Sequence, residues 1–479
     1  MASVQQVTYS GASRGSGQAV AALLALGAAL YLTLMPFEFR QISFADAWAM
    51  YTSQTFHMPG PGERQQWVAN VLMFVPLGLF WTLWLTSGRR SVALRIIVVA
   101  AVSLLALLVT ATVEFIQVWI PYRAPSPVDM SGNLAGAFAG AVAGAVVGER
   151  LWRVCAAIAS GQRALSLDHV LLGYTLAYVF ASLFPFDFPL SHSEVVARFA
   201  SDSWGLWVAP EGCTHGARCL VLAVLKPLLA IPVGIWLLAR MPGRGIARVG
   251  LAIAAAIVFT VALELLQFLL YSGVADGRSA LLRGGGLIVG VALAGSATTA
   301  SLQAFRGRWG FVVSLVLAIP YGVGVVALVT GLTGYHWDVA RAIEQLQSLS
   351  FLPFYYHYFV SEAVAARSIL YQTIAYAPLG VLLWLGTGGQ RLGALVRPHG
   401  AWIAAAAAVA LSLVAEGLKL FAEAERPDPT SLIIAMVVAA LAYRACVLLF
   451  DPPARHAPAG RAGDMPGPGA PSAQPGTQE

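Results

Sequence analysis

Residues 114–133 read EFIQVWIPYRAPSPVDMSGN and join two long apolar segments. Five strongly polar side chains lie within this short stretch, namely Glu114, Gln117, Arg123, Asp129 and Asn133. Such groups are costly beside lipid, so an apolar chain that keeps them needs a structural or a functional reason.

The composition around this stretch is that of a membrane protein. Of 479 residues, 58% are hydrophobic and only 11% are charged. A water-soluble core of ordinary proportions cannot bury that much apolar surface, so lipid must cover part of it. Apolar runs of about 20 residues predict about twelve transmembrane helices. They lie near residues 18–36, 67–86, 96–120, 131–148, 168–184, 219–239, 249–271, 284–300, 311–332, 369–386, 401–421 and 430–450. The predicted fold class is an all-α, polytopic integral membrane protein.

Charge predicts the orientation of these helices. The short connections carry clustered arginines, for example Arg89 and Arg90, or Arg240 and Arg244, whereas acidic residues gather in the longer loops. By the positive-inside rule the arginine-rich face is cytoplasmic, and both termini lie on it. The net charge of +6 is therefore a property of the inner leaflet, and no nucleic-acid partner is expected. Residues 451–479, rich in Pro, Gly and Ala, are predicted to be a disordered cytoplasmic tail.

The four cysteines and the outer histidines give no metal-site pattern. Cys155 and Cys446 are predicted to be buried, reduced packing residues. Cys213 and Cys219 flank His215 in an outer loop, where either a disulfide or, with further ligands, a metal site is conceivable. The histidines of the outer segments share no position or spacing and are interpreted as solvated loop residues; they are His57, His192, His215, His336 and His357.

Three sequence marks occur in the same order three times along the chain. The first is a Pro-Phe corner after a span, at Pro36, Pro185 and Pro353. The second is a proline inside a span with a glycine two residues later, at Pro76, Pro232 and Pro378. The third is a glutamate near the outer end of the next span, at Glu114, Glu264 and Glu416. These marks predict three parallel four-helix repeats, as modules 1–160, 161–310 and 311–450, related by an axis along the membrane normal.

The first module resembles the VanZ-like family of bacterial membrane proteins. The resemblance covers roughly residues 20–150 and rests on the Pro36-Phe37 corner, on the motif NVLMFVPLG at 70–78, and on a polar series. That series is Glu114, Gln117, Arg123, Ser126, Asp129, Asn133, Gly136 and Ala137. It implies a bacterial inner-membrane location, a cell-envelope context and an association with resistance to teicoplanin-type glycopeptide antibiotics. It supplies a class of protein and no defined reaction.

The other two modules match this polar series only in part. The second has Glu264, Gln267, Arg278 and Ser279, but the positions expected to hold the aspartate and the asparagine read Leu282 and Gly286. The third has Glu416 and Arg426, with Lys419 in place of the glutamine. We therefore expect any function of the series to belong to the first module.

The polar residues of the first module are predicted to meet at the outer end of a helical hairpin. Ser126, Pro127 and Asp129 have the order of a helix start, with serine as N-cap and proline at the first helical position. Asp129 and Asn133 then share one helix face. Asn70, six residues before Pro76, adds a polar group to the same outer cavity.

Three interpretations of this cluster stay open. It can be a hydrogen-bond network that locks two helices together, with Arg123 paired to Asp129 or Glu114. It can be a headgroup site, where Arg123 meets an anionic lipid or lipid-linked saccharide. It can also be catalytic, with Glu114 or Asp129 as general base.

A glycine stripe on the helix that follows the cluster is predicted to allow a close helix approach within the module, or else to form a gate or a homodimer seam. Its members are Gly132, Gly136, Gly140, Gly144 and Gly148.

The leading functional hypothesis is an envelope protein that binds or handles an envelope lipid, a lipid-linked saccharide or a glycopeptide at its outer face, without enzymatic turnover. A transporter or lipid flippase, and an intramembrane transferase or hydrolase, are the alternatives. No Walker loop, His-Glu-x-x-His or Gly-x-Ser-x-Gly motif occurs, and no catalytic residue, metal or cofactor is expected. The lipid bilayer is the one partner that composition requires, and the sequence leaves the oligomeric state open.

Overall fold

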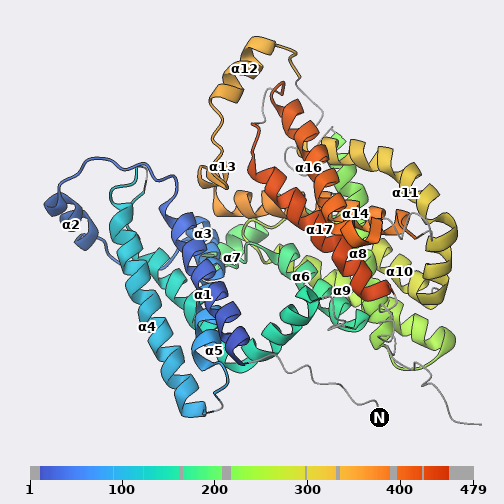
Figure 1. Cartoon of the computed structure of the whole chain (residues 1–479), viewed down its shortest axis with the longest axis horizontal. Helices are drawn as coiled ribbons and strands as arrows, with labels where there is room; N and C mark the ends of the chain where they lie inside the picture. The colour runs from blue at the N-terminus through green and yellow to red at the C-terminus, as the bar shows by residue number, and fades with distance from the viewer. Residues whose placement is uncertain are drawn as a thin grey trace, which may run out of the picture.

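The computed structural model describes residues 11–89, 91–121, 123–160, 166–207, 217–296, 299–330, 335–388, 396–422 and 426–451. Within these ranges the chain is almost entirely helical, and eleven helices are long and apolar enough to cross a membrane. A twelfth apolar helix, α6 (Leu167–Leu183), is shorter. The all-α, polytopic fold is thus confirmed, and each predicted span corresponds to a helix (Figure 1). The predicted tail beyond Asp451 lies outside the described residues.

The helices follow one another in three similar sets. The first set is α1 (Gly11–Leu34), the short α2 (Phe44–Thr52), α3 (Pro61–Thr86), α4 (Val92–Gln117) and α5 (Pro127–Ala159). The second is α6, the short α7 (His192–Phe199), α8 (Ala217–Arg240), α9 (Gly245–Phe268) and α10 (Gly277–Ser296). The third is α11 (Thr299–Thr330), α12 (Val339–Gln347), α13 (Tyr355–Tyr358), α14 (Glu362–Gly386), α16 (Gly400–Lys419) and α17 (Thr430–Phe450), with a 3-10 turn at Arg397–His399.

Backbone features recur at matching places in the three sets. Phe37, Phe186 and Phe354, each following the proline of a Pro-Phe corner, all have left-handed backbone conformations, with φ of 64°, 61° and 63°. Bulky residues rarely adopt this region, so three such residues at one sequence mark are an unusual shared feature. This agreement supports the proposal of three related modules, which we call modules 1, 2 and 3.

Each module has a buried core of its own. In module 1 the core includes Phe74 and Leu77 of α3 with Ala137 of α5, and in module 2 it includes Val233 of α8 with Leu287 of α10. The largest cluster belongs to module 3 and centres on Tyr376, Trp384 and Tyr443.

The second and fourth long helices of each module pack against each other at very short range. A Cβ added to Gly78 of α3 would lie 2.8 Å from the backbone nitrogen of Ala141 on α5. One added to Gly380 of α14 would lie 2.7 Å from the backbone nitrogen of Tyr443 on α17. Real Cβ atoms do not approach backbone so closely, so these glycines are what lets the helix backbones touch.

The glycine stripe of α5 faces the same seam within module 1. A Cβ at Gly132 or Gly144 would lie 2.9 Å or 2.6 Å from a carbonyl oxygen of α3. A Cβ at Gly136 or Gly140 would lie 2.8 Å or 2.9 Å from a carbonyl carbon of α3. A Cβ at Gly148 would meet only the Leu83 side chain, at 3.2 Å. The stripe therefore lies against α3, which supports packing within the module over a gate or a homodimer seam.

Each module contacts the other two. Arg64 of α3 donates hydrogen bonds to Glu194 of α7 and to the carbonyl of Phe188, both at 2.9 Å. These bonds from Arg64 hold the pKa of the Glu194 carboxyl at about 2, so the contact between modules 1 and 2 is a true ion pair. Tyr31 of α1 donates to the carbonyl of Pro353 in module 3 at 2.8 Å, and α8 packs on α11. Figure 1 shows the helices of module 1 on the left and those of modules 2 and 3 overlapping on the right.

The cysteines differ in part from expectation. Cys446 is buried as predicted, but Cys155 is exposed, because it lies near the end of α5 beyond the packed part of the seam. Cys219 is disulfide-bonded. Cys213 and His215 lie outside the described residues.

Candidate functional site

The recurring glutamate lies at the start of the last helix in each module and caps that helix in modules 1 and 3. Glu114 Oε2 accepts the backbone N–H of Ser126 at 2.8 Å, and Glu416 Oε2 accepts that of Asp428 at 2.8 Å, across the same interval of 12 residues. In module 2 Glu264 lies close to the backbone N–H of Asp276, again 12 residues further on, but its carboxylate oxygens form no hydrogen bond of good geometry. The first N–H groups of a helix have no partner inside the helix, so a buried carboxylate stabilises this end. The glutamate therefore belongs to the architecture.

The helix start in module 1 is confirmed. Ser126 is the N-cap of α5, its hydroxyl accepts the N–H of Asp129 at 3.2 Å, and Pro127 is the first helical residue. The cap leaves the Asp129 carboxylate directed at α3, where Oδ2 accepts from Gln66 Nε2 at 2.7 Å. Asp129 is therefore bonded to α3 and, among the described residues, forms no ion pair with Arg123.

The shared cap also corrects the register between modules. Ser279 and Arg283 lie as many residues after Glu264 as Asp129 and Asn133 lie after Glu114, so they are the counterparts of these two residues. The expectation that Leu282 and Gly286 occupy these positions was wrong, because it treated Arg278 as the counterpart of Arg123. Arg278 instead lies on α10, two residues after Asp276, which is the counterpart of Ser126 at the same interval of 12 residues from the glutamate.

Internal cations neutralise the glutamates of modules 2 and 3. Arg283 Nη1 lies 3.1 Å from Glu264 Oε1, and its Nη2 donates to Gln267 Oε1 at 3.3 Å. Lys419 Nζ donates to Glu416 Oε1 at 3.0 Å. These cationic side chains are largely buried, so each of the two glutamates has a counter-charge inside its own module, and we call these polar sets closed in that sense.

Module 1 has an amide where module 2 has a cation, and its polar set is open. Asn133 is 2% exposed; its Nδ2 donates to Thr110 Oγ1 at 2.8 Å, but its Oδ1 has no hydrogen-bond partner. Buried acceptors without a partner are rare in folded proteins and call for an explanation, such as a ligand or an ordered water. Gln117 is satisfied, because its Nε2 donates to the carbonyl of Thr33 at 2.8 Å.

Arg123 stacks on an aromatic ring of module 3. Its guanidinium lies over the ring of Tyr358 in module 3, 4.8 Å from the ring centroid. Among the described residues its side chain forms no hydrogen bond and no ion pair. The interpretation in which Arg123 pairs with Asp129 or Glu114 is therefore wrong: the cation is held by an aromatic face and keeps its donors free.

A cavity of about 520 Å³ brings the candidate residues together. All six line it: Asn70, Glu114, Gln117, Arg123, Asp129 and Asn133. Its remaining wall is mostly apolar and comes from α1 and α3 of module 1 and from α13 and α14 of module 3, with Leu32, Met73 and Ile369 among its members. A polar end beside an apolar wall, in a volume of this size, suits a small amphiphile.

Sequence reasoning missed one residue of this cavity. His357 of α13 was interpreted as a solvated loop residue, yet its side chain is only 9% exposed and lines the cavity. Its Nδ1 lies 3.2 Å from Asp428 Oδ2. Its position three residues after the Phe354 corner was the one available signal, because this corner lies at the outer ends of spans.

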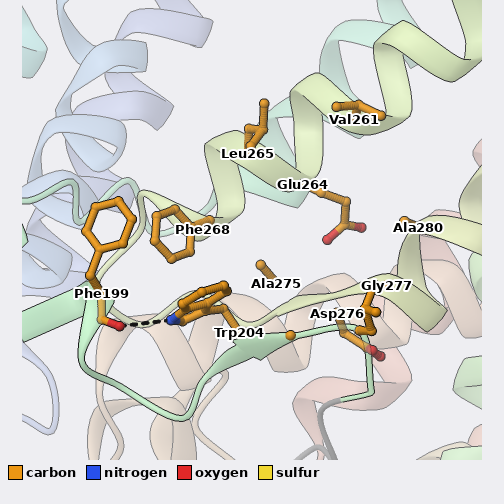
Figure 2. Close-up of a pocket in the computed structure, with 12 residues that line it drawn as sticks. Phe199, Trp204, Val261, Glu264, Leu265, Phe268, Ala275, Asp276, Gly277 and Ala280 are labelled. Carbon is orange, nitrogen blue, oxygen red and sulfur yellow. Dashed lines mark hydrogen bonds between the residues drawn. The ribbon is translucent and has the colours of Figure 1, made fainter.

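Module 2 has a cavity of its own, of about 460 Å³. Figure 2 shows Phe199, Trp204 and Phe268 grouped at one end and Glu264 pointing from α9 toward the segment of Ala275 and Asp276. That segment forms a two-residue parallel pairing, β1 (Trp204–Gly205) with β2 (Ala275–Asp276). Arg283 pairs with Glu264, and the described residues that line this cavity include no cation comparable to Arg123 of module 1.

The fold and the site together define a polytopic helical membrane protein with a polar cavity in its first four-span module. Residues 5–148 match the family model VanZ/LLP1, so this first part of the chain is a VanZ-like domain. Neither a curated protein nor a solved structure matches the chain.

Substituting the three glutamates distinguishes the open module from the closed ones. In Glu264→Gln or Glu416→Gln the amide can still cap the helix, but the buried Arg283 or Lys419 loses its counter-charge, so thermal stability in detergent should fall clearly. Glu114→Gln should change it little. All three alanine variants should be destabilised, by about 1–3 kcal/mol, because a buried N–H loses its acceptor. Equal losses in the three glutamine variants would contradict an open polar set in module 1.

Proposed function

We propose that the VanZ-like module binds the headgroup of an anionic envelope lipid or lipid-linked saccharide at the outer face of the bacterial inner membrane. The proposal includes the orientation predicted from the arginine clusters, with both termini cytoplasmic. One observation carries it: a cavity between apolar walls holds a guanidinium that has no anionic partner among the described residues and a buried amide oxygen without a donor.

Arg123 suits the anionic part of such a headgroup. A guanidinium offers five N–H donors in a planar fork that matches the oxygens of a phosphate or carboxylate. Stacking on Tyr358 holds the side chain in place without using those donors. The arginine is therefore ordered before a ligand arrives, which lowers the entropic cost of binding.

The rest of the cavity suits the other parts of an amphiphile. Asn133 Oδ1 and the Glu114 and Asp129 carboxylates are acceptors for hydroxyl or amino groups. Leu32 and Met73 belong to the apolar wall, which suits an acyl or isoprenoid chain. This division accounts for a polar cluster that an apolar chain would otherwise avoid.

A titration with one anionic lipid tests the proposal. Purified full-length protein in detergent is titrated with phosphatidylglycerol, and the bound fraction is read by native mass spectrometry. Arg123→Gln should weaken binding by roughly tenfold to a hundredfold, because charge-assisted hydrogen bonds are lost.

Arg278→Gln is the matched control. This arginine is half-exposed, lies 3.9 Å from Asp276 and does not line the module 1 cavity, so its loss should leave binding unchanged. Equal affinity of the wild-type protein and Arg123→Gln, at equal thermal stability, would refute the proposed function.

A further inference from the structure

The cavity of module 1 is completed by an Asp–His pair from module 3. His357 and Asp428 lie 3.2 Å apart, with side chains only 9% and 12% exposed. Asp428 also accepts the N–H of Thr430 through Oδ1 at 2.9 Å, and its own N–H is bound by Glu416. The helix cap of module 3 thus fixes the carboxylate that faces the imidazole.

This arrangement determines which atom of His357 is available. Burial raises the pKa of Asp428, but the neighbouring His357 and the hydrogen bond from Thr430 lower it more, so the net shift is downward. Nδ1 of His357 faces this carboxylate at 3.2 Å without a hydrogen bond of good geometry, and the tautomer with its proton on Nδ1 is the one that this contact favours. Nε2 then presents a lone pair, and it has no hydrogen-bond partner although it is buried at the cavity wall.

Among the described residues that line it, the cavity consequently holds one cation without an ion pair and several acceptors. Arg123 supplies donors for an anionic group. Asn133 Oδ1 and His357 Nε2 are both buried acceptors without a donor, one from each side of the cavity. A headgroup with a phosphate alone would satisfy Arg123 and leave these acceptors unpaired, which costs binding free energy.

Resting on the proposed function, we infer that His357 of module 3 is a binding residue of the module 1 cavity, and that the headgroup carries a hydroxyl or ammonium donor beside its anionic group. Phosphatidylglycerol, with two hydroxyls, has both features. Phosphatidylcholine has the phosphate and no hydrogen-bond donor. The wild-type protein should therefore bind phosphatidylglycerol more tightly, by about tenfold for one satisfied acceptor.

The test titrates full-length protein with each of the two lipids. His357→Phe keeps an aromatic ring but removes the acceptor, so affinity for phosphatidylglycerol should fall about tenfold while that for phosphatidylcholine is unchanged. His357→Gln keeps an acceptor and should retain part of the preference. His192→Phe, at the exposed start of α7, is the matched control and should leave both affinities unchanged.

The ratio of the affinities for the two lipids, and not either affinity alone, tests the inference. Equal falls for the two lipids in His357→Phe would show a structural role and overturn it, as would a wild-type protein without preference. If His357→Phe does not fold, His357→Gln decides by the ratio of the two affinities: a wild-type ratio overturns the inference. Arg123→Gln should weaken the binding of both lipids, because both have a phosphate. Failure of the proposed function can therefore be distinguished from failure of the inference about His357.

Discussion

Alanine at Gly78 or Gly136 should strongly lower the thermal stability of the protein. At each position the new Cβ would lie 2.8 Å from backbone atoms of the facing helix. A helix backbone cannot move aside like a side chain, so α3 and α5 would have to separate along the seam. Overpacking typically costs about 1–3 kcal/mol, and a clash between two backbones belongs at or above the upper end of that range.

Two further glycines serve as graded controls for this prediction. A Cβ at Gly148 meets only the flexible side chain of Leu83, at 3.2 Å, and should have a small effect. Gly27 on α1 has no neighbour within 4 Å, so alanine there should be neutral or slightly stabilising through helix propensity. Thermal unfolding in detergent measures the order of the melting temperatures of these alanine variants. A melting temperature of Gly136→Ala equal to that of Gly27→Ala would contradict the close contact of α3 and α5.

Replacing Arg306 by methionine should destabilise module 3 to a comparable degree. Arg306 is 1% exposed, forms an ion pair with Asp451, donates through Nε to the carbonyl of Trp384 at 2.9 Å, and lies over that tryptophan ring. Removing one member of a buried pair leaves the other charge uncompensated, at a cost of about 3–5 kcal/mol. The ion pair joins the start of α11 to the end of α17, so its loss should destabilise both of these helix ends.

Arg308→Met is the matched control for this substitution. It lies two residues further along α11, is exposed, and stacks only on the adjacent Trp309. Thermal unfolding of both variants, with limited proteolysis of the chain around Asp451, measures the difference. Similar melting temperatures for the two variants would contradict a stabilising role of the buried pair.

The helices and the helix start of the polar hairpin could be predicted from sequence because both are local. Span length follows from bilayer thickness, and the Ser126 cap follows from three neighbouring residues. The span predicted near 168–184 is α6, which has 17 residues. The prolines predicted inside spans, Pro76, Pro232 and Pro378, do lie inside helices.

The chemistry of the site could be predicted only in part, because it depends on contacts between distant segments. All six proposed residues line one cavity, but the partner of Arg123 is Tyr358, far away in the sequence. The buried state of His357 depends on Asp428, which belongs to another helix of its module. The register of module 2 was predicted wrongly for a related reason: arginine identity was a weaker guide than the interval of 12 residues between the glutamate and the start of the last helix.

The three modules share one architecture, but their polar residues suit different roles. Modules 2 and 3 keep the capping glutamate and neutralise it with Arg283 or Lys419, which suits a scaffold. Module 1 keeps the same cap with an amide at the position of Arg283, and module 3 supplies one wall of the resulting cavity. The division into modules remains a proposal, supported by the shared corners, caps and glycine contacts.

A structure of the full-length protein in nanodiscs containing phosphatidylglycerol tests the central claim most directly. The account predicts headgroup density inside the module 1 cavity, with the phosphate beside the Arg123 guanidinium and a hydroxyl within hydrogen-bond distance of Asn133 Oδ1 or His357 Nε2. Arg123→Gln in the same nanodiscs should lose that density. A well-resolved cavity that holds no lipid in the wild-type protein, or a headgroup bound only elsewhere on the surface, would contradict it.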